Sequence, residues 1–391
     1  MRWCRRIAPI NPYSAAPPEF RAVTIADGAI LRINPHAIAA NWQFLAARHH
    51  ATCPQSAIGA AVKANAYGVG VDIAAPALAA AGCRHFFTAT LDEALALRAL
   101  LPTHWIAVLN GAPRSGVSDF IAHHLHPVLN SLTDLASWQS VAPRPDAPTA
   151  LLHLDTGMAR LGLDQAETRH LLDHPALLGA TRLDYLMSHF ASAELHDAPS
   201  NQAQSALFAT LHAQLTHATG QPLKTSLANS AAIFLGPRAA SDLARPGYAL
   251  YGGNPTPNAP NPMQPVLTLS APVLQIRSIA KGSSVGYNAT WTAQRATRVA
   301  TIPIGYADGI FRAASNQLTA RHRSKVIHQI GRVSMDLLTF DVTDHPEIQP
   351  GSDLTVLDDV QTIETLAIQA GTSGYEVLTS LGARYRRVIE P

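Results

Sequence analysis

Short apolar runs alternate with helical patterns along much of this 391-residue chain, and no other feature constrains the fold as strongly. Strand-like runs are expected at residues 29–33, 57–60, 85–90, 105–111, 125–129, 151–155, 185–190 and 223–227. Helical patterns lie between several of them, as at residues 201–219, where Leu207, Leu211 and Leu215 form one apolar stripe before Gly220. Repeated strand–helix units of this spacing predict a parallel sheet. Their number favours a closed, TIM-like (β/α)₈ barrel over an open sheet.

A proline-rich segment at residues 254–262 interrupts this alternation and marks a domain boundary. Beyond it, turn residues separate short alternating runs, with two helical segments near the end: strands at 266–269, 273–279, 298–304, 326–330, 337–342 and 354–357, and helices at 363–370 and 375–381. This texture is typical of a mainly antiparallel β domain. We therefore expect a loose N-terminal extension at residues 1–26, a barrel domain at 27–262 and a β domain at 263–391.

The composition excludes several classes of function. Hydrophobic residues make up 47% and charged residues 14%, which is typical of a compact soluble globule. The formal charge is only +2, so nucleic-acid binding is not expected, and the partners should be small molecules or another copy of the chain. No apolar stretch is long enough to span a membrane, and the arginines near the N-terminus precede no secretory signal core. Cys4, Cys53 and Cys83 have neither disulfide-like nor metal-like spacing, which indicates a cytoplasmic protein without a metal site.

Lys63 stands where the expected strand at residues 57–60 gives way to a loop. Loops at this end of barrel strands carry the chemistry of α/β folds. Tyr67 follows four residues later, and Gly68 and Gly70 allow a tight turn close to a ligand. A lysine amine held in a dry pocket can lose its proton and condense with an aldehyde, so Lys63 is a candidate Schiff-base lysine. The alternative is a solvated loop charge.

The string Val-Lys-Ala-Asn-Ala-Tyr-Gly-Val-Gly at residues 62–70 resembles the pyridoxal phosphate (PLP) lysine motif of the alanine racemase family. Further motifs of that family follow in order as far as Arg387. The resemblance implies the PLP fold type III, in which a barrel precedes a β domain. It also implies that Lys63 binds PLP and that L- and D-alanine are interconverted by two bases. The product D-alanine would supply peptidoglycan, or one enantiomer would be catabolised.

The second base is expected to be Tyr287, in the family-like string Val-Gly-Tyr-Asn-Ala-Thr-Trp-Thr-Ala at residues 285–293. One acid–base group must stand on each face of the planar intermediate, and Lys63 supplies the other. A tyrosine has an unperturbed pKa near 10, so this role requires neighbours that stabilise phenolate. In the family this tyrosine comes from the second subunit, which implies a homodimer with shared active sites. The alternative is an interfacial tyrosine that caps a strand.

The same resemblance implies that ten residues bind the cofactor: Lys63, Tyr67, Arg160, His189, Asn229, Ser230, Arg245, Gly247, Tyr248 and Tyr375. Arg245 would face the pyridine nitrogen and keep it unprotonated, since a guanidinium holds its proton. His189 would pack over the ring. Ser230 and the tyrosine hydroxyls would hold the phosphate with nearby backbone N–H groups. Simpler interpretations are a surface ion pair for Arg245, an N-cap for Ser230 and a structural role for His189.

On the substrate side, the string at residues 153–162 resembles a family motif in which Arg160 reaches both the PLP phenolic oxygen and the substrate carboxylate. Many members have a carbamylated lysine that orients this arginine, whereas this chain has His153. The imidazole, a bound anion or a different acid replaces it, or Arg160 is held less firmly. Met335 resembles the residue whose backbone N–H binds the substrate carboxylate from the second subunit. Tyr306 resembles an entrance residue that, with Tyr375, limits the pocket to a small side chain.

Three other functions compete with an alanine racemase. The nearest is a racemase for serine, lysine or a broad range of side chains, although members of the broad class are typically exported and no signal sequence is expected here. A decarboxylase of basic amino acids would place a carboxylate at the pyridine nitrogen, where this chain has Arg245. A PLP carrier protein, which is not an enzyme, would resemble the barrel alone and lack Tyr287 and Met335.

Overall fold

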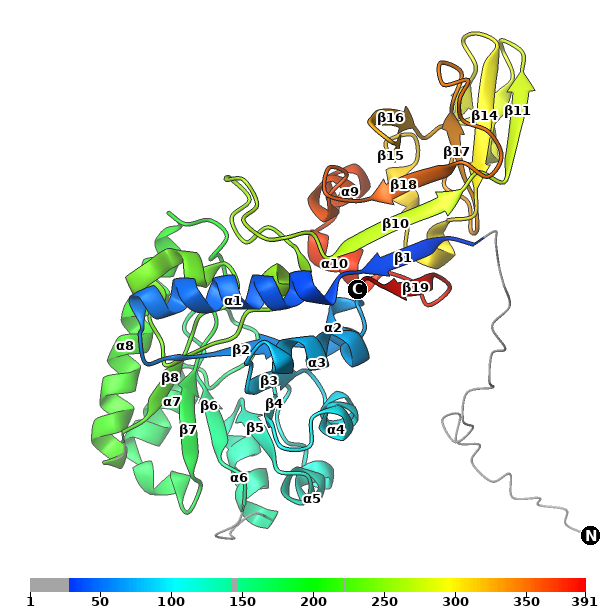
Figure 1. Cartoon of the computed structure of the whole chain (residues 1–391). Helices are drawn as coiled ribbons and strands as arrows, with labels where there is room; N and C mark the ends of the chain where they lie inside the picture. The colour runs from blue at the N-terminus through cyan, green and yellow to red at the C-terminus, as the bar shows by residue number, and fades with distance from the viewer. Residues whose placement is uncertain (1–27, 142–146, 221) are drawn as a thin grey trace, which may run out of the picture.

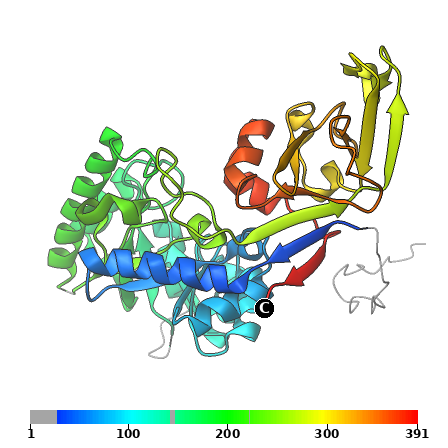
Figure 2. The ribbon, with the colours of Figure 1, turned by 45° about the horizontal axis from the view of Figure 1, so that its top comes forward.

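The computed structural model describes residues 28–141, 147–220 and 222–391. The predicted N-terminal extension, residues 1–26, lies outside the described residues. A helix-covered barrel and a β domain lie beside each other, and strands β1 and β10 run between them (Figure 1). Figure 2 shows the same two bodies from another side, with the β domain extending away from the barrel.

The barrel sheet is eight-stranded, and all its strand pairs are parallel. Its strands are β8 (Lys224–Ser226), β7 (Leu183–Met187), β6 (Ala150–His153), β5 (Leu125–Leu129), β4 (Trp105–Val108), β3 (His85–Thr88), β2 (Ala57–Ala61) and β9 (Leu243–Ala244), in spatial order. The backbone N–H of Arg245 donates to the carbonyl of Ala228 at 2.8 Å, which links the two end strands. The TIM-like barrel predicted from the sequence is confirmed.

Helices cover the outside of this sheet: α1 (Pro35–Thr52), α3 (Val71–Ala80), α4 (Leu91–Leu100), α5 (Val117–Ala122), α6 (Leu132–Val141), α7 (Gln165–Asp173) and α8 (Pro199–Thr219) (Figure 1). Local sequence sets where they begin. Asn34 caps α1 by accepting the Ala37 N–H at 2.8 Å, with proline in the first turn, as expected. Thr90 and Glu93 form a capping box at the start of α4. Across the described ranges, no helix combines the length and apolar character that crossing a bilayer requires.

The β domain is mainly antiparallel, as predicted. A six-stranded sheet has the order β16 (Lys325–His328), β15 (Thr319–His322), β18 (Asp353–Leu357), β10 (Leu267–Pro272), β1 (Ile30–Ile33) and β19 (Arg386–Ile389). A three-stranded sheet contains β11 (Gln275–Ile279), β14 (Thr297–Ile302) and β17 (Leu338–Asp341), and a two-stranded one contains β12 (Ser284–Val285) and β13 (Trp291–Thr292). The helices α9 (Ile363–Ala370) and α10 (Gly374–Thr379) lie on the side that faces the barrel (Figure 1).

The first strand is not a barrel strand, in contrast to the prediction. β1 pairs antiparallel with β10 and parallel with β19. Leu31 and Ile33 are buried while Ile30 and Arg32 are half-buried, which is the pattern of a sheet with one covered face and not of a parallel barrel. The predicted domains, 27–262 and 263–391, do not allow for this crossover, and their limits along the chain stay a prediction.

A polar cluster lies at the N-terminal ends of the barrel strands, opposite Lys63. The Trp105 indole stacks on His126 with ring centroids 4.5 Å apart and donates to Asp184 at 3.3 Å. The Thr149 hydroxyl donates to the same carboxylate at 2.5 Å. His126 Nδ1 lies 2.9 Å from the Thr149 carbonyl, which can only accept, so this nitrogen carries the proton. Burial lowers the pKa of His126 to about 4, and the ring is neutral at neutral pH.

This cluster predicts sensitivity to acid. Between pH 6.5 and 4 the unfolded chain protonates His126 and the folded chain does not, so the free energy of unfolding falls as pH falls. Each such group changes the free energy of unfolding by about 1.4 kcal/mol per pH unit in this range. The free energy of unfolding, measured in urea at pH 6 and pH 5, should fall less with pH in His126→Asn than in wild type. The difference should correspond to about one proton fewer taken up on unfolding. Equal slopes in the two proteins would contradict the assignment.

Candidate active site

A pocket of about 820 Å³ opens among the loops that follow the barrel strands. It is lined by every residue predicted to bind the cofactor: Lys63, Tyr67, Arg160, His189, Asn229, Ser230, Arg245, Gly247, Tyr248 and Tyr375. Most of these residues follow the ends of parallel strands, which meet at one rim of a barrel. Tyr375 comes instead from α10 of the β domain. The pocket therefore lies where the two bodies meet.

Lys63 follows β2 and begins the segment Lys63–Tyr67, which is labelled α2 in Figure 1. Burial lowers the pKa of Lys63, and the nearby cations Arg160 and Arg245 lower it further, while Glu93 raises it. An amine with a lowered pKa is neutral, and therefore nucleophilic, in a larger fraction of molecules at neutral pH. The interpretation of Lys63 as a solvated loop charge does not account for this burial.

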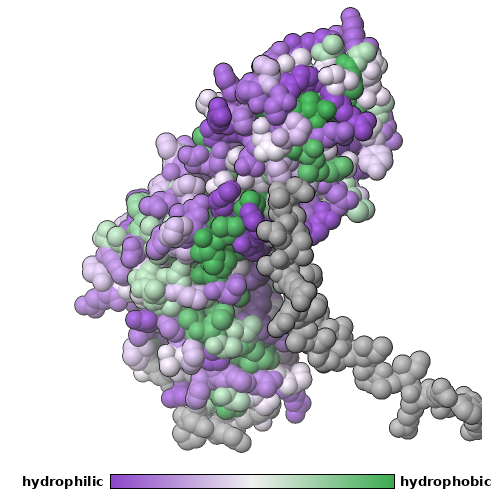
Figure 3. All heavy atoms as spheres, turned by 45° about the vertical axis from the view of Figure 1, so that its right-hand side comes forward, coloured by the Kyte–Doolittle hydropathy of each residue, from purple (hydrophilic) through white to green (hydrophobic). Residues whose placement is uncertain are grey.

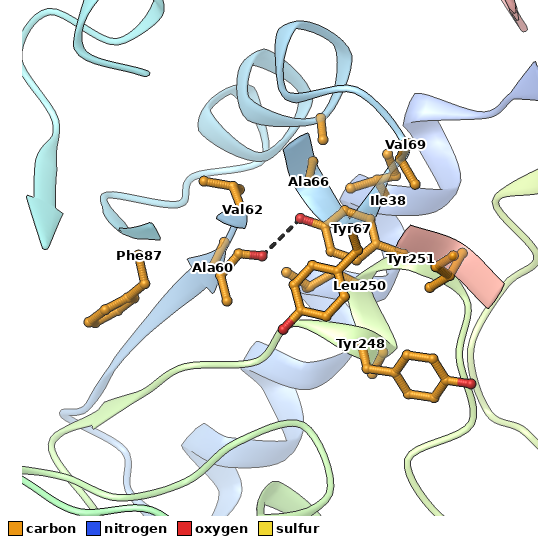
Figure 4. Packing of buried hydrophobic residues seen from close by; sticks show 14 of the residues in the cluster. Ile38, Ala60, Val62, Ala66, Tyr67, Val69, Phe87, Tyr248, Leu250 and Tyr251 are labelled. Carbon is orange, nitrogen blue, oxygen red and sulfur yellow. Dashed lines mark hydrogen bonds between the residues drawn. The ribbon is translucent and has the colours of Figure 1, made fainter. Parts of the chain in front are cut away.

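Three tyrosines, Tyr67, Tyr248 and Tyr375, line the pocket that contains Lys63, and the fully buried Tyr251 packs against Tyr67. Tyr67 stacks on Tyr251 with centroids 5.0 Å apart, and Tyr248 stacks on Tyr375 at 4.1 Å. Figure 4 shows Tyr67 and Tyr251 side by side under the turn after β2. The Tyr251 hydroxyl donates to a β2 carbonyl at 2.9 Å, and that of Tyr248 donates to a carboxylate of α9 at 2.8 Å. Burial raises the pKa of Tyr67 to about 12, so it is a hydrogen-bond donor at neutral pH.

Gly247 has no room for a side chain. A Cβ there would lie 2.8 Å from Cζ of Tyr67 and 3.2 Å from Cβ of Ala61. We expect Gly247→Ala to displace Tyr67 and to lower the free energy of unfolding by about 1–3 kcal/mol in urea denaturation. Tyr67→Phe removes the hydroxyl that the new methyl meets first, so the double variant should regain part of this loss. An unchanged free energy of unfolding in Gly247→Ala would contradict this expectation, because it would show that Tyr67 can move aside without loss of stability.

Ser230 lines the pocket close to Gly247. Its hydroxyl oxygen accepts the N–H groups of Gly247 at 2.9 Å and Ala249 at 3.2 Å. Those donors begin the 3₁₀ helix Tyr248–Tyr251, so Ser230 caps this helix from a distant part of the chain. Asn229 instead caps the turn that follows it, by accepting the Ala232 N–H at 2.9 Å. Because both lone pairs of Ser230 are engaged, its hydroxyl proton is free for an acceptor in the pocket.

Arg245 is a buried cation whose hydrogen-bond partners, within the described residues, are all neutral. Its guanidinium donates to the Ser226 hydroxyl at 2.6 Å and the Ser188 carbonyl at 2.9 Å, and it lies 3.4 Å from Nδ1 of His189. Burial lowers its pKa to about 10, so it remains charged at neutral pH. The interpretation as a surface ion pair is wrong. Burial and Arg245 hold the pKa of His189 well below its usual value, so His189 is a neutral ring here.

His153 is held in one tautomer by Asn130. The Asn130 amide nitrogen donates to two carbonyls, at 3.0 and 3.1 Å, and its oxygen therefore faces His153 Nδ1 at 2.7 Å. This oxygen can only accept, so Nδ1 carries the proton and Nε2 is an acceptor. Burial lowers the pKa of His153 to about 4, with Arg245 and Arg160 adding to the effect. A neutral imidazole thus lines the pocket with Arg160.

Arg160 lies at the end of a loop organised by one carboxylate. Asp155 accepts the backbone N–H groups of the next residues, Gly157 and Met158 at 2.9 Å and Ala159 at 3.0 Å. These bonds lower the pKa of Asp155, although burial alone would raise it. Arg160 itself is exposed. The guanidinium is thus presented by an ordered loop at the open side of the pocket.

Tyr287 and Met335 are not brought to this pocket by their own chain. Tyr287 is 67% exposed, in a 3₁₀ turn between β12 and β13, and Met335 is 53% exposed. Tyr306 is 43% exposed. Its backbone N–H donates to the Ser334 carbonyl at 2.9 Å, and the N–H of the next residue donates to the Met335 carbonyl at 3.0 Å, so the two segments lie side by side. On the face shown in Figure 3, apolar side chains form separate groups between polar ones, over both bodies.

The sequence analysis missed three carboxamide or carboxylate residues at this rim. Asn130 follows β5 directly, as Lys63 follows β2 after one residue, so polar residues just after strands were the available signal. Glu93 accepts the Ala64 N–H at 2.7 Å. Glu194 lines the pocket and accepts the Tyr375 hydroxyl at 3.4 Å. No group of three or more potential metal ligands occurs in the described part of the chain.

Comparison with known proteins agrees with this arrangement. Residues 33–255 match the alanine racemase N-terminal domain, and residues 266–389 match the alanine racemase C-terminal domain. The chain is 56% identical over 360 residues to alanine racemase of Acidiphilium cryptum, covering 92% of this chain and 98% of the relative. It is 44% identical over 367 residues to alanine racemase of Methylobacterium nodulans, covering 93% and 96%. The crystal structure of alanine racemase from Bartonella henselae with covalently bound pyridoxal phosphate superposes with a TM-score of 0.87 at 38% identity, covering 93% of this chain and 99% of that one. The chain belongs to the alanine racemase family.

Proposed function

We propose that the protein is a PLP-dependent alanine racemase that interconverts L- and D-alanine. The observation that carries this proposal is Lys63, an amine with a lowered pKa in a pocket that also contains the buried cation Arg245. The relative from Bartonella henselae, which has covalently bound pyridoxal phosphate, supports the choice of cofactor. The relatives described as alanine racemases support the choice of substrate.

The described residues fit each polar group of PLP. Lys63 would form the covalent link with the aldehyde. Ser230, with Tyr67, Tyr375, Asn229 and the backbone at residues 247 and 248, would hold the phosphate, since Ser230 retains a free hydroxyl proton. Arg245 would face the pyridine nitrogen and donate to it, because its charge has only neutral partners among the described residues. A pocket of about 820 Å³ is within the range of about 300–1,000 Å³ that is usual for such ligands.

Two residues would move the proton of the substrate. Bound PLP supplies a sink for the electron pair that the Cα–H bond leaves behind. The Lys63 amine would take or return a proton on one face of the substrate. Tyr287 of a second copy serves the opposite face. Its exposure in its own chain and its absence from that chain's pocket support a role in a homodimer.

The substrate carboxylate would be bound from both copies. Arg160 would donate from the same chain as Lys63, and the backbone N–H of Met335 would donate from the other. Tyr306 of the other copy and Tyr375 would leave room for a methyl side chain only. D-Alanine made in this way would supply peptidoglycan. The cytoplasmic location predicted from the cysteines stays a prediction.

Trapping of the cofactor lysine tests this proposal. The chain contains four lysines, Lys63, Lys224, Lys281 and Lys325. Borohydride reduction of the PLP-loaded protein, followed by peptide mapping, should place the pyridoxyl label on Lys63 alone. A label on another lysine, or no label, would contradict the assignment of the site.

His153 gives a second prediction, about the group that orients Arg160. If the Nε2 acceptor of His153 supports the guanidinium, His153→Leu should raise KM for alanine about tenfold, the value of one hydrogen bond to a charged group. His153→Gln, which retains an acceptor, should recover part of this loss. Steady-state kinetics with and without added chloride measure the effect. Wild-type activity that depends on chloride would show that a bound anion takes this role.

A further inference from the structure

The backbone directly after Lys63 forms a left-handed turn. Ala64, Asn65, Ala66 and Tyr67 all have φ between 52° and 55°. Residues with a Cβ atom disfavour this conformation, and a run of four is unusual. Such a turn persists only when surrounding contacts impose it. The contacts at its two ends therefore determine how Lys63 is presented.

Glu93 holds the beginning of the turn. One oxygen of its carboxylate accepts the Ala64 N–H at 2.7 Å. The other oxygen accepts the N–H groups of Ala89 at 2.8 Å and Thr90 at 3.3 Å, at the junction of β3 and α4. The same side chain thus joins the neighbouring strand to the residue that follows Lys63. A carboxylate is the strongest acceptor available for this purpose.

Arg387 holds the end of the turn. Its two terminal nitrogens donate to the carbonyls of Val69 at 2.5 Å and Gly68 at 2.9 Å. Arg387 belongs to β19, at the opposite end of the chain. Between the two contacts, the Asn65 carboxamide accepts the Val71 N–H at 2.9 Å. The turn is thus fixed from the barrel on one side and from the β domain on the other.

We propose that Glu93 and Arg387 act as a two-ended clamp that imposes the left-handed turn and thereby positions Lys63 for the aldehyde of the cofactor. The inference rests on the proposed function in one respect, namely that Lys63 is the cofactor lysine. Both are positioning residues, since they act through the backbone of residues 64–69. Glu93 has a second effect, because its negative charge opposes the fall in the pKa of Lys63 that burial, Arg160 and Arg245 cause.

A purely structural role for Glu93 makes a different prediction. Glu93 is also part of the capping box of α4, in which the Thr90 hydroxyl accepts its backbone N–H at 3.3 Å. Thr90→Ala removes the cap and leaves the bond between Glu93 and Ala64 in place. If Glu93 matters only as a helix cap, Thr90→Ala and Glu93→Gln should disturb the turn equally.

The test compares Glu93→Gln with Thr90→Ala and with Asp92→Asn, an exposed carboxylate in the same helical turn. Glutamine cannot replace Glu93, because its amide would turn a donor toward N–H groups that need an acceptor. In the PLP-loaded protein, hydrogen–deuterium exchange of residues 63–70 should become about tenfold faster in Glu93→Gln, and the dissociation constant of PLP should rise about tenfold. Thr90→Ala should lower the melting temperature without either change, and Asp92→Asn should match wild type.

Arg387→Gln tests the other end of the clamp, with Arg386→Gln as the neighbouring control, since Arg386 is exposed on the same strand. Faster exchange of residues 63–70 in Arg387→Gln, with wild-type exchange in Arg386→Gln, supports the proposal. Wild-type exchange in both Glu93→Gln and Arg387→Gln overturns it, as does equal acceleration by Thr90→Ala. Borohydride mapping of wild type separates this from the proposed function: a label away from Lys63 refutes the function, whereas the exchange data judge the clamp by themselves.

Discussion

Replacement of Lys63 by alanine is expected to lower racemisation of alanine by at least about 10⁴-fold. Two contributions vanish together, the covalent link to the cofactor and the base on one face of the substrate. The measurement is the rate of loss of optical activity of L-alanine, with bound PLP quantified in the same sample. Bound PLP should fall as well, although Ser230 and Tyr67, which are proposed to hold its phosphate, are unchanged.

Lys281→Ala is the matched control for this variant, because Lys281 is an exposed lysine of the β domain outside the pocket. It should racemise alanine at the wild-type rate. Substantial racemisation by Lys63→Ala would mean that another group performs its chemistry.

Tyr287→Phe should lower racemisation by about 10²–10⁴-fold, the usual contribution of one acid–base group, and retain PLP. Retention is expected because this variant leaves unchanged every residue that is proposed to bind the cofactor. Mixing chains that carry Lys63→Ala with chains that carry Tyr287→Phe should then restore one working site per mixed dimer. Recovery is possible only if Tyr287 serves the other copy.

The control for this experiment mixes Lys63→Ala chains with chains that carry both substitutions. No site in that mixture has Lys63, so it should stay inactive. Failure of the first mixture to recover, with mixed dimers present, would contradict a shared site and place the function of Tyr287 within its own chain.

Local patterns made most of the barrel predictable. Its strands are short buried runs, and the pair Asn34 and Pro35 predicts the start of the first helix. The eighth strand, β9, has only two residues, Leu243 and Ala244, which is too short for a periodic signal. β1 was assigned to the wrong sheet because a local pattern does not state its partner, although its alternation was visible.

The candidate site was predictable wherever its residues follow strand ends or stand in family-like strings, as Lys63 and Arg245 do. The residues that hold them were not. Asn130 contacts His153, Glu93 contacts Ala64 and Arg387 contacts Gly68 across 23, 29 and 319 positions of sequence. Such contacts depend on the packing of whole elements, and no short window of sequence contains both partners.

The competing functions differ at particular residues. A decarboxylase would need a carboxylate near the pyridine nitrogen, whereas the residue proposed for that position is Arg245, which lies among neutral groups in the described structure. A carrier protein built on the barrel alone would not extend through the β domain, which matches the family model over residues 266–389. A racemase of broader range is separated from an alanine racemase by the measured substrate range.

Incubation of the PLP-loaded protein with L-alanine in D₂O tests the central claim most directly, with optical activity and deuterium at Cα followed together. We predict that optical activity is lost while one deuterium enters at Cα. Exchange with retained configuration would show that Lys63 and the cofactor work without a base on the second face, contrary to the role of Tyr287. Neither exchange nor racemisation, under conditions in which serine or lysine is racemised, would contradict alanine as the substrate.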